Sequence, residues 1–73
     1  MDFDETPLEM AKRRVAEAKA RVKEQAARVE QAARWGQDTT PAKAALAVFE
    51  GTLRLLQEDL ARLEGAAGSS SPP

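Results

Sequence analysis

A long stretch without glycine or proline constrains this chain more than any other feature. Between Leu8 and Trp35 most residues are Ala, Lys, Arg, Glu or Gln, which have high helix propensity. Charged residues make up 32% of the sequence and aromatic residues only 4%, a composition typical of long solvated helices rather than of sheets. The sequence therefore predicts an all-α protein built on one long helix.

Recognisable signals mark both ends of this helix. Thr6 is a good N-cap, Pro7 suits the first helical position, and Glu9 can complete a capping box. Gly36 suits the left-handed conformation that often follows a helix. We expect the first helix to span residues 7–35.

A second helix follows after a short turn. Thr40 and Pro41 repeat the start signal; Thr40 is the favoured cap because a residue before proline disfavours the helical region, and Asp38 is the alternative. Gly65 is the expected stop, and the Ala, Gly, Ser and Pro residues after it cannot form a core. The predicted organisation is a helical hairpin over 1–65, with helix 7–35, turn 36–40 and helix 41–64, followed by a disordered tail, 66–73.

Hydrophobic residues recur along both helices with a coiled-coil spacing. The short connection favours an antiparallel arrangement, so the predicted fold is a coiled-coil-like two-helix hairpin. The first helix contributes a thin face of valine and alanine, and the second a thicker face of leucine and phenylalanine. The predicted hairpin core consists of Leu8, Val15, Val22, Val29, Trp35, Leu46, Phe49, Leu53, Leu56, Leu60 and Leu63.

Two residues on this core face allow more than one interpretation. Gln25 is polar, and it is either solvated beside a loose layer or a device that fixes the alignment of the helices. The solvated interpretation is favoured. Trp35 is expected to close the core against the turn, and the alternative is a hot spot for a binding partner.

Some apolar residues of the second helix lie outside the predicted core. Ala45, Val48, Thr52 and Leu55 form a second uncharged strip, which would face water in an isolated hairpin. Scattered exposed aliphatic residues are common in proteins. Two large ones at helical spacing favour a packing face, so we expect this strip to be an interface that pairs two hairpins into a homodimeric four-helix bundle.

The residues needed for common catalytic mechanisms are missing. The sequence contains no His and no Cys, which excludes Ser–His, Cys–His and zinc sites built on these side chains. The carboxylates alternate with basic residues on outward positions, and four acid–base pairs at i, i+4 are expected: Glu9–Arg13, Glu17–Arg21, Glu24–Arg28 and Glu30–Arg34. We expect no catalytic, cofactor-binding or metal-binding residue, no cofactor, and no enzymatic activity.

Binding to nucleic acids or membranes is also disfavoured. The first helix is basic, but acidic residues are interleaved, the net charge is −1, and no stacking aromatics accompany the basic residues. Its apolar face lacks the bulky residues of interfacial helices, and no segment predicts a membrane span or a secretory signal. The cytoplasm is the expected location.

The turn and the second helix resemble a known set of proteins. The residues Gly36-Gln37-Asp38-Thr39, followed by Leu46, Phe49-Glu50 and Leu53, are similar to small uncharacterised bacterial proteins with a helix, a Gly-x-Asp-Thr turn and a second helix. The resemblance covers roughly residues 15 to 60. It implies a helical hairpin without an assigned activity.

The sequence predicts a non-enzymatic oligomerisation or protein–protein interaction module. The expected partner is a second copy of the chain or an unidentified protein. The alternative is a weak binder of nucleic acids or other anionic polymers, through the basic face of the first helix. A designed scaffold without function is disfavoured by Gln25 in the core face and Gly51 within the second helix.

Overall fold

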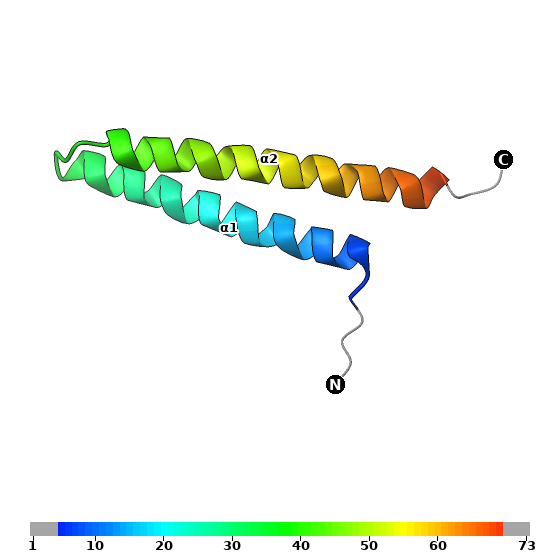
Figure 1. The fold of residues 1–73 in the computed structure, drawn as a ribbon. Helices are drawn as coiled ribbons and strands as arrows, with labels where there is room; N and C mark the ends of the chain where they lie inside the picture. Colours follow the sequence, from blue (N-terminus) through cyan, green and yellow to red (C-terminus); the bar gives the residue numbers. More distant parts are fainter. Residues whose placement is uncertain (1–4, 70–73) are drawn as a thin grey trace.

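Two antiparallel helices form the molecule. The computed structural model describes residues 5–69 of the 73-residue chain, and side chains as far as Ala66. Helix α1 (Pro7–Arg34) and helix α2 (Thr40–Ser69) lie side by side and are joined by a short turn (Figure 1). No strand occurs within the described part of the chain. The predicted all-α hairpin is confirmed.

Helix α1 begins with the predicted capping box. The Thr6 hydroxyl accepts a hydrogen bond from the backbone N–H of Glu9 at 3.0 Å, and the Glu9 carboxylate accepts one from the N–H of Thr6, also at 3.0 Å. Pro7 occupies the first helical position, where its missing N–H leaves no bond unmade.

Helix α1 ends one residue earlier than predicted, at Arg34, and Trp35 is its C-cap. Gly36 has a φ of 70°, in the left-handed region that favours glycine. Gln37 donates its N–H to the carbonyl of Ala32 at 2.9 Å, and Gly36 donates to Ala33 at 3.2 Å. This pair of bonds is a Schellman motif, which satisfies carbonyls that the helix end would otherwise leave unpaired.

The start of α2 differs from the prediction. Thr40 is the first helical residue rather than the cap, and Pro41 follows it within the first turn. Asp38, the alternative, provides the capping contact because its carboxylate accepts the backbone N–H of Thr40 at 3.0 Å. Hydrogen bonds from Thr40, foremost from its backbone N–H, lower the pKa of the Asp38 carboxyl.

The end of α2 was predicted wrongly. The helix does not stop at Glu64 before Gly65 but continues to Ser69, into the segment expected to be disordered. Gly65 keeps helical dihedral angles, since Gly36 is the only glycine with a positive φ among the described residues. Ala66 and Ala67 follow Gly65, and alanine has the highest helix propensity, so the helix propagates through it. The remainder of the predicted tail, 70–73, lies outside the described residues.

The two helices are staggered. Gln25 contacts Ala42, Ala18 lies near Phe49, and Ala11 lies near Leu56, so each step of seven residues back along α1 matches seven forward along α2. In this register Pro7 is level with Leu60, and α2 runs nine residues further, to Ser69. This is an overhang of about 14 Å. Figure 1 shows α2 extending past the start of α1. We call this end the open end.

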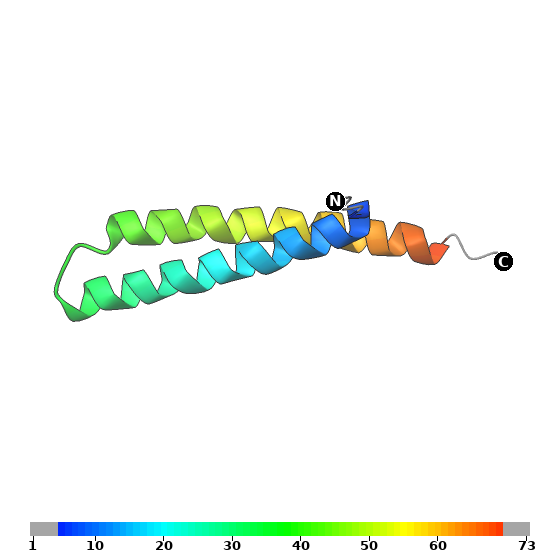
Figure 2. The ribbon, with the colours of Figure 1, turned by 90° about the horizontal axis from the view of Figure 1, so that it is seen from below.

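At the opposite end, α1 extends past the start of α2. The helices cross at a shallow angle, so the space between the ribbons widens toward the open end in Figure 1 and toward the turn in Figure 2. The turn in Figure 2 spans this separation as an extended segment.

The core between the helices is thin. Among residues 5–66, only Val15 and Ala18 are buried apolar residues, with 6% and 8% of their surface exposed. Nine other residues of the predicted core are half-buried: Leu8, Val22, Val29, Leu46, Phe49, Leu53, Leu56, Leu60 and Leu63. Two helices can cover only one side of each other, so their seam residues keep an edge in contact with water.

Gln25 is buried, contrary to the favoured interpretation of a solvated glutamine. Only 6% of its surface is exposed, and its side-chain amide donates a hydrogen bond to the backbone carbonyl of Ala42 at 3.0 Å. This bond links the two helices at one defined level. A buried contact of this kind agrees with the second interpretation, in which Gln25 fixes the alignment of the helices.

Candidate interaction surface

The predicted interface residues lie on one side of α2. Val48 and Leu55 are 65% and 63% exposed, Thr52 is also exposed, and Ala45 is half-buried. These four residues, which we call the apolar strip, recur at alternating steps of three and four and so form a second heptad seam beside the core. Large exposed aliphatic residues at this spacing leave a second apolar face of α2 uncovered by α1.

A hollow adjoins the apolar strip. It has a volume of about 270 Å³ and is lined by Val48, Phe49, Thr52 and Leu56 of α2, together with Arg14, Glu17, Ala18 and Arg21 of α1. A dry apolar cavity of ~150 Å³ in a protein core can hold a molecule of the size of benzene. The hollow can therefore accept an aliphatic side chain from a second helix, with charged side chains at its rim.

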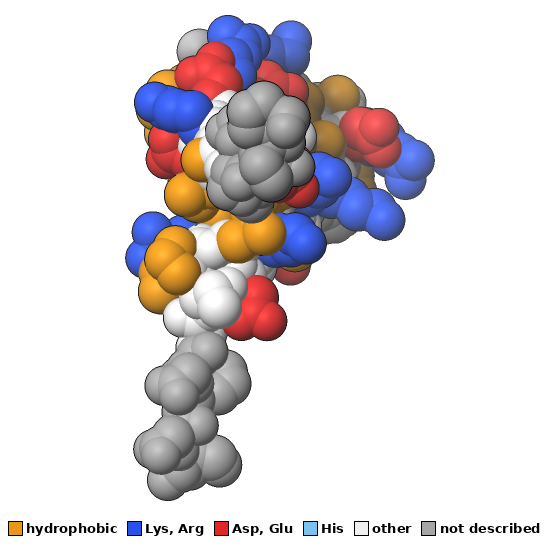
Figure 3. All heavy atoms as spheres, turned by 90° about the vertical axis from the view of Figure 1, so that its right-hand side faces the viewer, with side chains coloured by type: hydrophobic (Ala, Val, Ile, Leu, Met, Phe, Trp, Pro, Cys, Tyr) orange, Lys and Arg blue, Asp and Glu red, His pale blue; other side chains and the backbone are white. Residues whose placement is uncertain are grey.

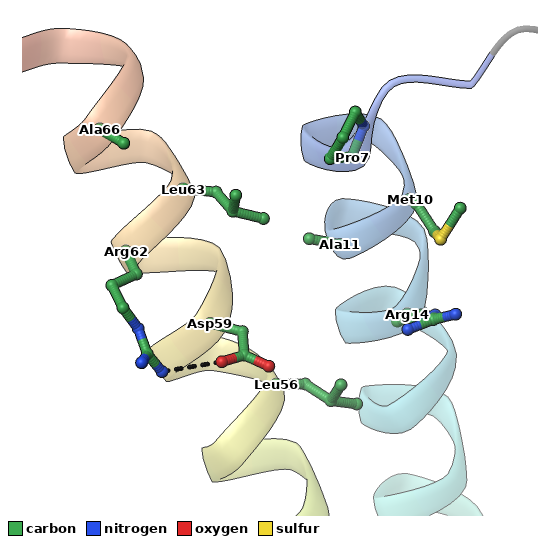
Figure 4. Close-up of a pocket in the computed structure, with 9 residues that line it drawn as sticks. All are labelled: Pro7, Met10, Ala11, Arg14, Leu56, Asp59, Arg62, Leu63 and Ala66. Carbon is green, nitrogen blue, oxygen red and sulfur yellow. Dashed lines mark hydrogen bonds and ion pairs between the residues drawn. The ribbon is translucent and has the colours of Figure 1, made fainter.

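A larger groove of about 560 Å³ lies between the helices at the open end. Figure 4 shows Leu56 and Leu63 pointing from α2 toward α1, and Ala11 pointing toward α2. The groove is lined by Pro7, Met10, Ala11, Arg14, Leu56, Asp59, Arg62, Leu63 and Ala66. Figure 3, which looks at the open end, shows exposed hydrophobic side chains among charged ones of both signs.

Sequence reasoning missed the open-end groove. Ala66 lines it, although the second helix was predicted to end two residues earlier, at Glu64. The stagger of the helices leaves Leu63 beyond the level of Pro7. No signal in the sequence indicated it, because heptad spacing does not show the axial shift between the helices.

Trp35 does not close the core as predicted. It is 67% exposed, because α1 runs past the first residue of α2 and no helix lies opposite its last turn. The prediction required the turn and the start of α2 to pack against Trp35. The alternative, a contact for a binding partner, stays a prediction.

The ion pairs of α1 differ from the predicted i, i+4 pattern. Glu5 forms two hydrogen bonds with Arg13, from Nε and Nη2, each at 2.9 Å, and Glu17 contacts Arg13 at 3.5 Å. Glu9 serves the capping box instead of pairing with Arg13. The hydrogen bond from Arg13 is the main cause that lowers the pKa of Glu5, and the same bond raises the pKa of Arg13. None of the four predicted pairs forms within residues 5–69, where the remaining ion pair joins Arg62 to Asp59 at 2.8 Å.

The other basic residues of α1 point into solvent. Seven of them are exposed and form no ion pair with another described residue: Lys12, Arg14, Lys19, Arg21, Lys23, Arg28 and Arg34. They spread around the helix rather than lining one face, since acidic residues separate them. The exposed surface of α1 is therefore hydrophilic and carries more positive than negative charge.

Two kinds of feature are absent from the described residues, a metal-binding cluster and a membrane span. No group of three or more carboxylate side chains within residues 5–69 is placed to hold a metal ion. Neither described helix has an apolar stretch long enough to span a bilayer. The features left are the apolar strip, its hollow, and the open-end groove.

Comparison with other proteins gives no relatives. No protein-family model matches the sequence, and no significant match is found among curated proteins or among solved structures. The fold and the surface define a class, a staggered two-helix hairpin with an uncovered apolar face. The resemblance to bacterial proteins with a Gly-x-Asp-Thr turn stays a prediction.

Proposed function

We propose that this hairpin is a non-enzymatic oligomerisation module, which pairs with a second copy through the apolar strip to form a four-helix bundle. The observation that carries the proposal is the exposure of Val48 and Leu55, at 65% and 63%, next to a hollow that can accept side chains. We also propose a cytoplasmic location, because no segment of the sequence predicts a membrane span or a secretory signal.

The thin core supports this proposal. No side chain of the described residues is fully buried, and only two apolar residues, Val15 and Ala18, have less than a tenth of their surface exposed. A domain of this size gains little stability from such a core, and the chain has no cysteine for a disulfide. A second copy carries the same uncovered apolar strip. Two identical strips can bury each other in a dimer with twofold symmetry.

Size-exclusion chromatography with light scattering tests the proposal. We expect the parent chain to have the mass of a dimer, and the double variant Val48→Lys, Leu55→Lys to have that of a monomer. The matched control is Ala47→Lys, Ala61→Lys, which adds the same charge to exposed positions of α2 away from the strip. A parent that stays monomeric at high concentration contradicts the proposal, and so does a double variant that keeps the parent's mass.

A second candidate function is weak binding of an anionic polymer such as DNA or RNA. The seven exposed basic residues of α1 without ion pairs favour it. The interleaved acids and the net charge of −1 oppose it. Affinity for duplex DNA measured across a salt series decides the matter, because a polymer binder shows a steep loss of affinity as salt increases.

A further inference from the structure

We infer that the second copy docks in one defined antiparallel register along α2. This inference rests on the proposed self-association and adds its geometry. In this register Val48 of each copy packs against Thr52 of the other, and Ala45 against Leu55, so the twofold axis passes between Val48 and Thr52. The occupant of the apolar strip is then the same strip of a second chain.

The composition of the strip supports this pairing. It contains one large residue, Leu55, one small residue, Ala45, and two β-branched residues of the same shape, Val48 and Thr52. In the proposed register Leu55 faces Ala45 and Val48 faces Thr52, so all four residues of the strip pair within the strip. Alternation of large and small residues lets two seams interdigitate. A shift of one heptad in either direction would place Leu55 opposite Asp38 or Val48 opposite Asp59, so an apolar residue would face a charged one.

Charge supports the same register. The seam of the strip continues through Asp59 and Arg62, which form an ion pair with each other. The proposed register brings Asp59 level with Pro41 of the second copy, in the first turn of its α2. A helix N-terminus favours a nearby negative charge, and the first turn of α2 has no acidic residue of its own. Asp59 of the second copy supplies it.

The neighbouring cation also finds a complementary group. Arg62 comes level with Asp38 of the second copy, whose carboxylate is exposed at the turn before α2. A shift of the register by four residues would instead bring Arg62 level with the first helical turn of the other chain. A positive charge there is unfavourable. The charges at the end of the seam therefore favour the proposed register over this shifted one.

The position of the hollow also fits the proposed register. The central hollow lies beside Val48 and Thr52, next to the proposed axis. Leu55 of the second copy is level with Ala45, one turn from this hollow, and Val48 and Thr52 of the second copy cover it. Arg14, Glu17 and Arg21 at its rim then surround the apolar contact with polar side chains.

Cysteine cross-linking tests the register, because the chain has no cysteine of its own. Val48→Cys and Thr52→Cys chains are mixed in equal amounts, dissociated, reassociated and oxidised, and the products are separated by mass spectrometry. We expect the mixed disulfide to dominate over both symmetric ones, since a disulfide needs Cα atoms within about 7 Å. A Thr52→Cys chain that cross-links to itself as efficiently places the axis at Thr52 and overturns the register.

A charge reversal provides an independent test. Asp59→Lys puts a cation at the N-terminus of α2 in the second copy, at two symmetric places, and we expect the dimer Kd to rise about 3- to 30-fold. The matched control is Glu58→Lys, one residue earlier on an exposed face outside the seam, which should change Kd less than twofold. Equal effects of the two variants overturn the register.

The two levels of the proposal fail in different ways. A parent chain that is monomeric at every concentration removes the proposed function and this inference together. A dimeric parent with dominant symmetric disulfides, or with no difference between Asp59→Lys and Glu58→Lys, removes the register and leaves self-association in place.

Discussion

Changing Gln25 to glutamate tests how the two helices are aligned. The substitution keeps the shape of the side chain and replaces its amide nitrogen, which donates to the Ala42 carbonyl at 3.0 Å, with a carboxylate oxygen. At pH 7 two acceptors then face each other at a position where the parent residue is only 6% exposed. A lost hydrogen bond costs ~0.5–1.5 kcal/mol, and an unsatisfied buried group ~1–3 kcal/mol or more when it is charged. We expect Gln25→Glu to lower the free energy of unfolding by about 2–4 kcal/mol.

The assay is thermal unfolding followed by far-UV circular dichroism at one fixed protein concentration. For a domain of this size, 1 kcal/mol changes Tm by roughly 4–8 °C, so the expected decrease is about 10–30 °C. The matched control is Gln57→Glu, the same chemical change at an exposed position of α2, where the effect should stay within ~0.5 kcal/mol.

The pH dependence of this variant has a definite sign. Burial raises the pKa of the introduced carboxyl, because it disfavours the charged form. A protonated carboxyl can donate to Ala42 again, so the difference in Tm between Gln25→Glu and the parent should shrink as the pH falls from 7 to 4. If Gln25→Glu melts at pH 7 within two degrees of Gln57→Glu, the reasoning about the buried contact is wrong.

Four further substitutions test other parts of the hairpin. Gly36→Ala should cost ~1–2 kcal/mol in a melt because of the positive φ, whereas Gly51→Ala, with open space around it, should gain ~0.5–1 kcal/mol. The lowered pKa of Glu5 means that its contact with Arg13 stabilises the fold above the ordinary carboxyl pKa and is lost as the pH falls through the lowered value. An acid titration of Tm should therefore decline less in Glu5→Gln than in the parent. Leu56→Ala should lower stability by ~1–3 kcal/mol in urea unfolding, below the range for full burial because Leu56 is half-buried.

Local signals predicted the fold where the determining contacts are local. The capping box of Thr6 and Glu9 and the left-handed Gly36 depend on residues within one turn of each other, and both form as predicted. The cap of α2 is also local, but Asp38 and Thr40 compete for it. The sequence favoured Thr40, which was wrong: Thr40 is the first residue of the helix, and the Asp38 carboxylate accepts its backbone N–H.

The error at Trp35 has its cause in the stagger of the helices, because the burial of Trp35 depends on whether α2 starts opposite it. The error at Gly65 is a local one, because the alanines that follow this glycine carry the helix onward. Heptad spacing fixes which face a residue occupies, but it leaves the axial shift between two helices open. The exposure of Val48 and Leu55, by contrast, follows from the face alone, and it agrees with the prediction.

The position of the Gln25 contact has a consequence for the order of folding. Gln25 and Ala42 are 17 residues apart in the chain, whereas Pro7 and Ala66, which line the open-end groove, are 59 residues apart. The entropy lost on closing a loop grows with the length of the loop. We therefore expect contacts near the turn to form first and contacts at the open end to form last. Substitutions near Gln25 should therefore slow refolding, while substitutions around Leu63 should mainly accelerate unfolding.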